Sequence, residues 1–195
     1  MFSTGLFTSM QEVRVAATLA AILIACALIL LRRTARTEEE QLTLEQRHAL
    51  NVERSRAIAR RFRKDVAMTM DHLRAVTPHE FEEVVLTALA HRGHRIRRSN
   101  RYTGDGGADG QAWIRGRRYL IQSKRYRRAI RPEHIEDFAR LCKRERARGL
   151  FVHTGNMGPM SLEADRRARR VVVLHGEALE RLVAGRRVRL KGVRL

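Results

Sequence analysis

A glycine-rich turn at residues 104–110, with the sequence Gly-Asp-Gly-Gly-Ala-Asp-Gly, places Asp109 at the start of a predicted strand. Little side-chain bulk surrounds this carboxylate, so its approach is open. Gln122 and Lys124 lie two residues apart on the next predicted strand, and strand alternation places both on one face. A carboxylate, an amide and an ammonium group therefore stand where strands would be expected to carry apolar residues.

These residue types suit the hydrolysis of a phosphodiester bond. That reaction needs a divalent cation to neutralise charge on the transition state and to lower the pKa of an attacking water. Mg²⁺ prefers oxygen ligands and needs only one or two protein carboxylates. Asp109 is the predicted anchor for the ion, Gln122 could add an amide oxygen, and Lys124 could orient the water or stabilise negative charge. Glu82 or Glu83, on a preceding predicted helix, could supply another carboxylate.

The segment that must position these groups begins with a helix start signal at Thr77. Thr77 is the expected N-cap, Pro78 the first helical residue, and Glu80 stands three residues after the cap. A helix of about fifteen residues follows and ends at Gly93. This helix carries both candidate glutamates.

The rest of the domain alternates strands and helices. Strands are predicted around residues 95–98, 108–114, 119–124, 149–153 and 171–174, and helices over 132–148, 161–169 and 177–183. The order helix, three strands, helix, strand, helix, strand, helix predicts an α/β fold, a mixed sheet flanked by helices.

Four segments stand in order along this domain: Phe81-Glu82, the turn from Gly104 to Gly110, Gln122-Ser123-Lys124, and Leu150-Phe151-Val152 running into Thr154. Together they resemble the catalytic domain of Mrr-type restriction endonucleases, a branch of the PD-(D/E)xK nuclease superfamily, over about residues 77–184. The resemblance implies a restriction-endonuclease-like fold, a Mg²⁺ or Mn²⁺ cofactor and a DNA substrate. It also implies Asp109, Gln122 and Glu82 as metal ligands and Lys124 as the catalytic lysine.

The N-terminal region departs from that family, whose members commonly add a DNA-reading domain. Residues 15–31, VAATLAAILIACALILL, carry no charge and span about 25 Å as a helix, which Arg14 can lengthen by snorkelling. We expect a short tail at 1–14, a transmembrane helix at 15–31, a charged helical stalk at 32–76 and the nuclease domain at 77–195. Arginines directly after the apolar run predict a single-pass protein with its C-terminal domain in the cytoplasm.

Two alternatives compete with the membrane helix. A cleaved signal peptide would need a basic start and a small-residue cleavage site, and neither is present before the arginine pair at 32 and 33. A lipoprotein would be cleaved before Cys26, but the apolar sequence continues to Leu31.

Positive charge is concentrated in the predicted nuclease domain. Residues 1–76 hold 12 Lys/Arg and 8 Asp/Glu, whereas residues 77–195 hold 28 and 13. Arginine binds phosphate oxygens in bidentate fashion, so this surplus indicates double-stranded DNA as a partner, with anionic lipid as an alternative. The predicted DNA contacts are Arg101, Arg118, Arg125, Arg127 and Arg128.

Three functions remain open from the sequence. The first is a membrane-anchored endonuclease that cuts foreign or modified double-stranded DNA, which implies a homodimer because a double-strand cut needs two active sites. The second is a non-catalytic adaptor that binds DNA or anionic lipid, and the third is a structure-selective repair nuclease. Asp105 could bind metal or cap the glycine turn, and Glu83 is expected to be a solvated helix residue.

Overall fold

The structure, a computed structural model, describes residues 17, 20–30, 43–65, 67–99, 107–190 and 193–195. The chain divides into two units, Met1–Arg47 and His48–Leu195. In the first unit, residues 20–30 are helical and exposed. No helix within the described ranges is long and apolar enough to cross a membrane. Residues 15, 16, 18, 19 and 31 of the predicted membrane helix lie outside those ranges.

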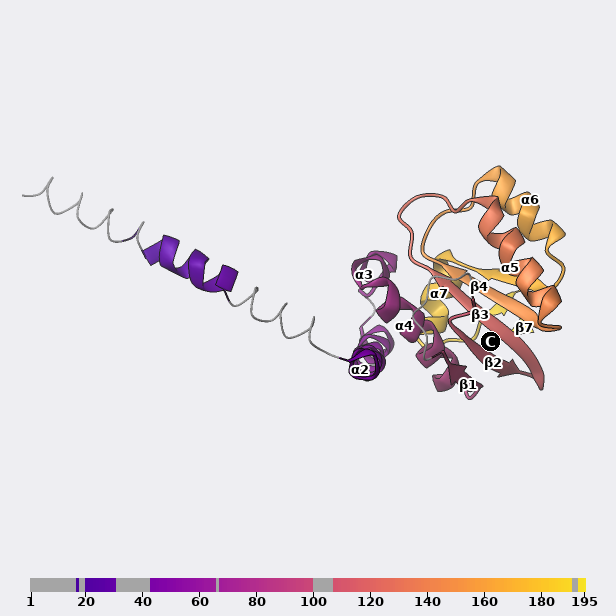
Figure 1. Cartoon of the computed structure of the whole chain (residues 1–195), viewed down its shortest axis with the longest axis horizontal. Coiled ribbons are helices and arrows are strands. Elements are labelled where there is room, and N and C mark those ends of the chain that lie inside the picture. Colours follow the sequence, from indigo (N-terminus) through magenta and orange to yellow (C-terminus); the bar gives the residue numbers. More distant parts are fainter. Residues whose placement is uncertain (1–16, 18–19, 31–42, 66, 100–106, 191–192) are drawn as a thin grey trace, which may run out of the picture. The chain divides into compact units, whose positions relative to one another are not determined.

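Five strands of the second unit form one mixed sheet in the order β1-β2-β3-β4-β5 (Figure 1). β1 (Arg95–Arg98), β2 (Gly110–Ile114) and β3 (Arg117–Lys124) are antiparallel neighbours, and β4 (Arg148–His153) and β5 (Val171–Leu174) run parallel to β3. The predicted strands and the mixed sheet are confirmed.

Helices cover both faces of this sheet. α4 (Pro78–His91) and α7 (Gly176–Val183) pack on one face, and α5 (Pro132–Arg144) and α6 (Pro159–Arg167) pack on the other, mainly over β4 and β5. The predicted order of elements is therefore confirmed.

β3 is the central strand, and its side chains alternate between two cores. Tyr119 and Ile121 are buried in the cluster with α4 and α7, whereas Leu120 is buried in the cluster with α5 and α6. Strand alternation places Gln122 and Lys124 on the same face as Leu120. The polar pair thus continues a buried apolar row at the end of the strand.

α4 begins as its sequence predicts. The Thr77 hydroxyl accepts a hydrogen bond from the Glu80 N–H at 3.2 Å, and a Glu80 carboxylate oxygen accepts from the Thr77 N–H at 2.8 Å. This reciprocal cap satisfies two backbone donors that have no partner within the helix. It fixes the start of the helix that carries Glu82.

Two further helices precede α4, namely α2 (Leu44–Lys64) and α3 (Met70–Ala75). α2 packs along α4, with the Ser55 and Thr87 hydroxyls 2.7 Å apart in a buried contact and Phe62 in the core. The helical character agrees with the sequence pattern. The packing places the chain from residue 48 in the same compact unit as the sheet. The division into a stalk at 32–76 and a nuclease domain at 77–195 stays a prediction.

Two details of the C-terminal region differ from the sequence analysis. α5 ends at Arg144 rather than near residue 148, because Arg146 adopts a left-handed backbone with φ of 50° and the Ala147 N–H closes back onto the Cys142 carbonyl at 3.0 Å. A hairpin of β6 (Arg189–Leu190) and β7 (Val193–Arg194) was not predicted, since strands of two residues are too short to show alternation.

The backbone of Arg146 generates a stability prediction. A left-handed conformation costs a non-glycine residue roughly 1–2 kcal/mol, and glycine returns about half of that through its larger unfolded-state entropy. We expect Arg146→Gly to raise the free energy of unfolding by about 0.5–1 kcal/mol in urea titrations. Arg144→Gly, inside α5, should lower it by about 1 kcal/mol. A similar loss in both variants would contradict the left-handed turn.

Candidate active site

Asp109 lies at the end of the β2–β3 ladder. Gly110 pairs with Ile121, and the Asp109 N–H donates to the Ile121 carbonyl at 2.8 Å. Its carboxylate Oδ2 accepts the Ser123 N–H at 2.5 Å. The carboxylate therefore takes the place of a backbone acceptor just beyond the last pair of the ladder.

The glycine that follows Asp109 permits this position. A Cβ at Gly110 would lie 2.8 Å from the Arg97 carbonyl oxygen and 3.0 Å from the Leu86 side chain. β2 can therefore approach both β1 and α4 closely. The Ser99 N–H also donates to the Asp109 carbonyl at 3.0 Å, so backbone contacts hold Asp109 from both neighbouring strands.

The environment of Asp109 disfavours an unaccompanied negative charge. Burial raises the pKa of its carboxyl to about 8, and the Glu82 carboxylate acts in the same direction. The Ser123 N–H and the Lys124 ammonium group act against this rise. Asp109 is half-buried and the Glu82 side chain is 21 % exposed. Two partly buried carboxylates that raise each other's pKa are stabilised by a proton or by a cation, so this pair fits a divalent ion.

Gln122 and Lys124 lie beside Asp109 at the carboxyl end of β3. The antiparallel pairing ends at Gly110 and Ile121, and beyond it the Asp109 carboxylate accepts the N–H of Ser123, the residue between Gln122 and Lys124. Gln122 is buried and Lys124 is half-buried. The structure thus brings the three predicted residues to one end of the sheet.

The two glutamates of α4 have different surroundings. The Glu82 side chain is 21 % exposed, and His79 Nδ1 lies 3.2 Å from its Oε2. Glu83 is only 2 % exposed, with Arg98 Nε at 3.2 Å and His48 Nδ1 at 3.5 Å from its carboxylate. The expectation that Glu83 is a solvated residue is wrong, because α2 and β1 cover it.

The carboxylate of Glu83 lies in a buried polar cluster with Arg98 and His48. Burial raises the pKa of Glu83 to about 7, and the Arg98 guanidinium opposes the rise. Among the described residues, no group of three or more His, Cys, Asp or Glu side chains is arranged around a metal position. Asp109, Glu82 and the Gln122 amide, predicted as metal ligands from the sequence, carry oxygen atoms, and Glu82 acts electrostatically on Asp109.

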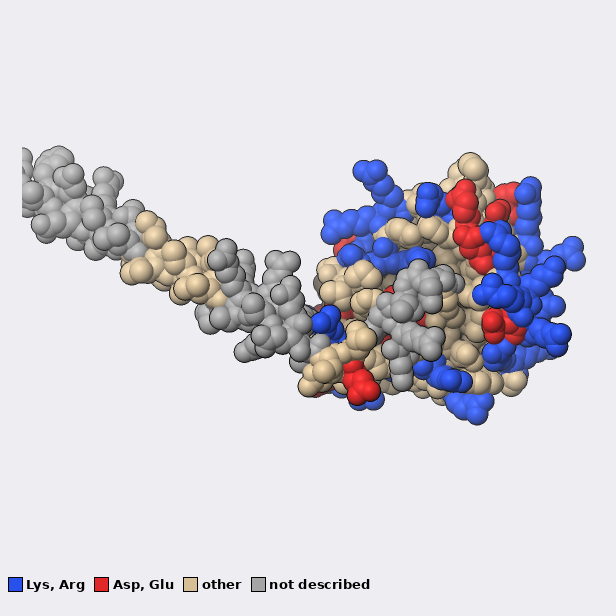
Figure 2. All heavy atoms as spheres, in the orientation of Figure 1, with Lys and Arg blue, Asp and Glu red and all other residues tan. Residues whose placement is uncertain are grey.

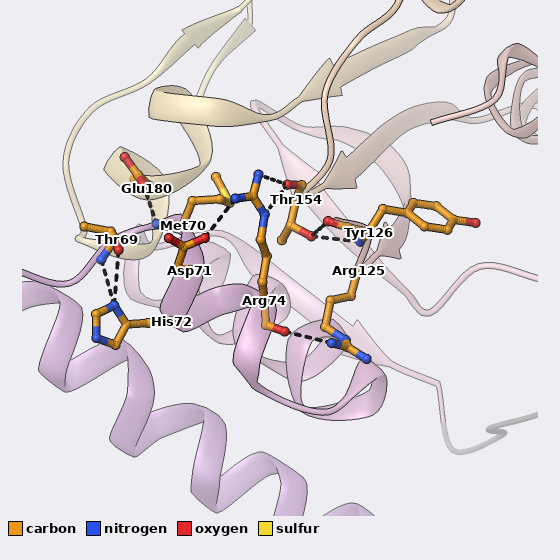
Figure 3. A network of polar contacts seen from close by, with 9 residues as sticks. All are labelled: Thr69, Met70, Asp71, His72, Arg74, Arg125, Tyr126, Thr154 and Glu180. Atoms are coloured by element: carbon orange, nitrogen blue, oxygen red, sulfur yellow. Dashed lines mark hydrogen bonds and ion pairs between the residues drawn. The ribbon is translucent and has the colours of Figure 1, made fainter. Parts of the chain in front are cut away.

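A polar network fixes the chain directly after Lys124 (Figure 3). Arg74 of α3 donates from Nε and Nη2 to the Thr154 carbonyl at 3.0 and 2.8 Å. The Thr154 hydroxyl bonds to both the N–H and the carbonyl of Tyr126, at 2.9 and 2.8 Å. Arg125 Nη1 donates to the Arg74 carbonyl at 2.7 Å. The ends of β3 and β4 are thereby tied to each other and to α3.

Sequence reasoning did not single out Arg74 or Thr154 as positioning residues. Arg74 stands 80 residues before its acceptor, and nothing in the local pattern indicates that pairing. Arg125 was a predicted DNA contact, and its guanidinium is engaged by the backbone of α3.

The other predicted DNA contacts fall into separate places. Arg118 lies at the opposite end of β3 from Lys124, and its guanidinium donates to the Glu145 carbonyl. Arg127 and Arg128 are exposed in the loop after β3, on the same side as Lys124. Arg101 lies outside the described residues, as does Asp105.

Two histidines that seem dispersed in the sequence meet near the carboxyl ends of β4 and β5. The His153 and His175 rings stack with centroids 5.0 Å apart and planes at 13°. His153 is fully buried, and neither of its ring nitrogens has a hydrogen-bond partner among the described residues, although the Gly155 backbone lies near enough to raise its pKa slightly. His153 is also in register with Lys124.

The buried His153 imidazole predicts a pH dependence of stability. Burial, and then His175, lower the pKa of His153 from 6.5 to about 3. Below pH 6.5 the unfolded chain gains a proton that folded His153 takes up only near pH 3. The contribution of His153 to stability is therefore fully present above pH 6.5 and is lost as the pH drops. This residue should contribute up to about 1.4 kcal/mol per pH unit.

His153→Phe should therefore flatten the fall of the free energy of unfolding between pH 6.5 and pH 4.5. Urea titrations at several pH values measure the slope. Phenylalanine preserves the ring packing against Phe151 and His175 but cannot be protonated. An unchanged slope would show that His153 does not limit acid stability.

Comparison with known proteins agrees with this arrangement. The family model Mrr_cat, described as a restriction endonuclease, matches residues 73–183, which is more than half of the chain and includes Glu82, Asp109, Gln122 and Lys124. No curated protein matched the chain, and no solved structure matched it. The chain therefore belongs to the Mrr-type restriction endonuclease family, and residues 73–183 correspond to its catalytic domain.

Proposed function

We propose that this protein is a divalent-metal-dependent endonuclease that hydrolyses phosphodiester bonds of double-stranded DNA. Membership of the family supports a nuclease in general terms. The observation that carries the finer proposal is the enclosed carboxylate of Asp109, which lies within electrostatic reach of both Glu82 and Lys124. A cation would compensate the two carboxylates, and the ammonium group lies beside them for a bound phosphate.

Asp109, Glu82 and the Gln122 amide oxygen would hold the ion. Oxygen donors favour Mg²⁺ or Mn²⁺, and Mg²⁺ keeps several waters when few carboxylates are available. The bound cation supplies charge neutralisation and a water of lowered pKa. The raised pKa of Asp109 means that the ion competes with a proton for this carboxylate near neutral pH.

Lys124 has the role of placing positive charge next to the scissile phosphate. Its strand is fixed on one side by β2 and on the other by β4, where the Thr154 N–H donates to the Lys124 carbonyl at 3.3 Å. The contacts of Arg74 and Thr154 hold the chain that follows. A preorganised ammonium group stabilises developing negative charge without reorganising during the reaction.

DNA would approach the site from the side on which the loop after β3 projects. Arg127, Arg128 and Arg131 are exposed in that loop, and Figure 2 shows basic side chains gathered at the upper left of the domain. Contacts of this kind bind phosphates and set position, not sequence. The proposed substrate is therefore foreign or modified double-stranded DNA engaged through its backbone.

Membrane anchoring and dimerisation complete the proposal. The uncharged run at residues 15–31 is long enough to be a single membrane helix, and the arginines after it favour a cytoplasmic C-terminal domain. One active site cuts one strand, so a double-strand break implies a homodimer. These two features rest on the sequence.

The experiment that tests the proposal is a cleavage assay with the full-length chain in a mild detergent. Methylated plasmid, unmethylated plasmid and a branched duplex are incubated with Mg²⁺, Mn²⁺ or chelator. We expect metal-dependent cutting that falls at least 100-fold in Asp109→Ala and in Lys124→Ala, because each removes charge stabilisation at the reacting phosphate. Asp137→Ala and Lys64→Ala, at exposed positions on α5 and α2, are the matched controls and should cut normally.

The other outcomes identify the alternatives. Salt-sensitive binding of DNA without any product would contradict the endonuclease and favour the non-catalytic adaptor. Cutting restricted to the branched duplex would favour the repair nuclease.

A further inference from the structure

A second group of basic residues lies at the end of the sheet opposite to Lys124. Parallel register pairs Tyr119 with Arg148 and Lys124 with His153, so the start of β4 and the catalytic lysine are at opposite ends. The carboxyl ends of α5 and α6 meet the start of β4 and β5 there. Six exposed basic residues lie near these helix ends, namely Lys143, Arg144, Arg146, Arg148, Arg169 and Arg170, and we call them the basic end. Arg115 and Arg117, at the β2–β3 turn, are exposed at the same end of the sheet.

Ion pairs do not neutralise the basic end, although one exposed acid, Glu145, lies between Arg144 and Arg146. No ion pair is found for any of these six residues within the described part of the chain, whereas Arg166 and Arg167 both pair with Glu163. Figure 2 shows many blue side chains, with some red ones among them, at the right of the domain, apart from the blue ones at the upper left. The domain therefore presents two separate basic surfaces.

Backbone conformation adds an independent observation. The described chain has two non-glycine residues with positive φ, Arg115 at 52° and Arg146 at 50°, and both lie at this end, in the β2–β3 turn and after α5. Glycine is the favoured residue at such positions. Arginine at both indicates that charge is placed here against the preference of the backbone, which is a common sign of a functional surface.

The composition of the basic end fits nucleic acid better than a lipid surface. Five of its six residues are arginine, whose planar group binds phosphate oxygens in bidentate fashion. Segments that lie on membranes also present large apolar side chains. The exposed ones of this domain's sheet and flanking helices, Met160 and Leu162, lie in the first half of α6, toward the other end.

We propose that the basic end is a second DNA-backbone contact surface, binding a part of the duplex that does not enter the active site. Five residues of strand separate Tyr119 from Lys124, which is about 17 Å. Phosphates held at the basic end thus belong to DNA distant from the cleaved bond. This inference rests on the proposed function for its substrate, but its binding test does not require cleavage.

The test measures binding of a fluorescent 40-base-pair duplex to the full-length chain in chelator, over a range of salt concentrations. Arg144→Glu/Arg148→Glu should weaken binding at least tenfold and lower the slope of log affinity against log salt by about 2, since each lost phosphate contact removes about 0.9. Arg60→Glu/Arg61→Glu, at exposed positions on α2, makes the same charge change and should alter the slope by much less.

A second variant separates binding from folding. Arg146→Gly relieves the left-handed backbone and should lower the salt slope by about 1 without loss of stability. With Mg²⁺, the double variant should cut a 12-base-pair duplex at the parental rate and the 40-base-pair duplex more slowly.

Three results would overturn the inference. The first is an unchanged salt slope in the double variant, and the second is an equal loss of DNA affinity in the α2 control. The third is a double variant that binds DNA normally but no longer prefers vesicles with one quarter phosphatidylglycerol to vesicles of phosphatidylcholine alone. If the parental protein binds DNA but cuts neither duplex, the proposed function fails, while the binding comparison still decides the role of the basic end.

Discussion

The hydrogen bond from the Ser123 N–H to the Asp109 carboxylate is the contact on which the site depends. It joins two adjacent strands at the point where their backbone ladder ends, and so holds an acid beside Gln122 and Lys124. The close approach of β2 to α4, which Gly110 permits, brings Glu82 within electrostatic reach of the same carboxylate. The sheet and its helices thus bring Glu82 toward residues that follow it by 27 to 42 positions.

The electrostatically unfavourable proximity of Asp109 and Glu82 is confined to the site, whereas the neighbouring Glu83 is paired with basic groups. Asp109 is enclosed near another carboxylate, which without a cation disfavours its charged form. Glu83, one residue from Glu82, is instead paired with Arg98 and His48 in the seam between α2, α4 and β1. Adjacent residues of α4 therefore have different roles. Glu82 acts electrostatically on Asp109, whereas Glu83 connects α2 to the domain.

Local signals accounted for much of the fold. Thr77, Pro78 and Glu80 predict the N-terminal cap of α4, and the structure confirms it. Apolar periodicity and turn residues predict the positions of the strands and helices, which the structure also confirms. Asp109, Gln122 and Lys124 could be selected because polar residues interrupt predicted strands. Local patterns could not show the burial of Glu83 or the contact of Arg74 with Thr154, because both depend on helices that return to the sheet from distant segments.

Local patterns likewise could not show which histidines meet or how the arginines are divided between the two ends of the sheet. His153 and His175 are 22 residues apart, and they stack because His153 ends β4 and His175 directly follows the parallel neighbour β5. The arginines around β3 form one cluster in the sequence, but an eight-residue strand carries Arg118 and Arg127 to opposite ends of the domain. Side-chain proximity of this kind follows from strand direction and length, which a linear charge pattern does not contain.

The central claim is that the enclosed carboxylate of Asp109 holds a divalent cation. Its most direct test is the binding of Mn²⁺ to the full-length chain at pH 8, followed by electron paramagnetic resonance, for the parental protein, Asp109→Asn and the exposed control Asp137→Asn. We predict one site per chain that is retained in the control and weakened at least tenfold in Asp109→Asn. Equal binding by all three proteins would contradict the account.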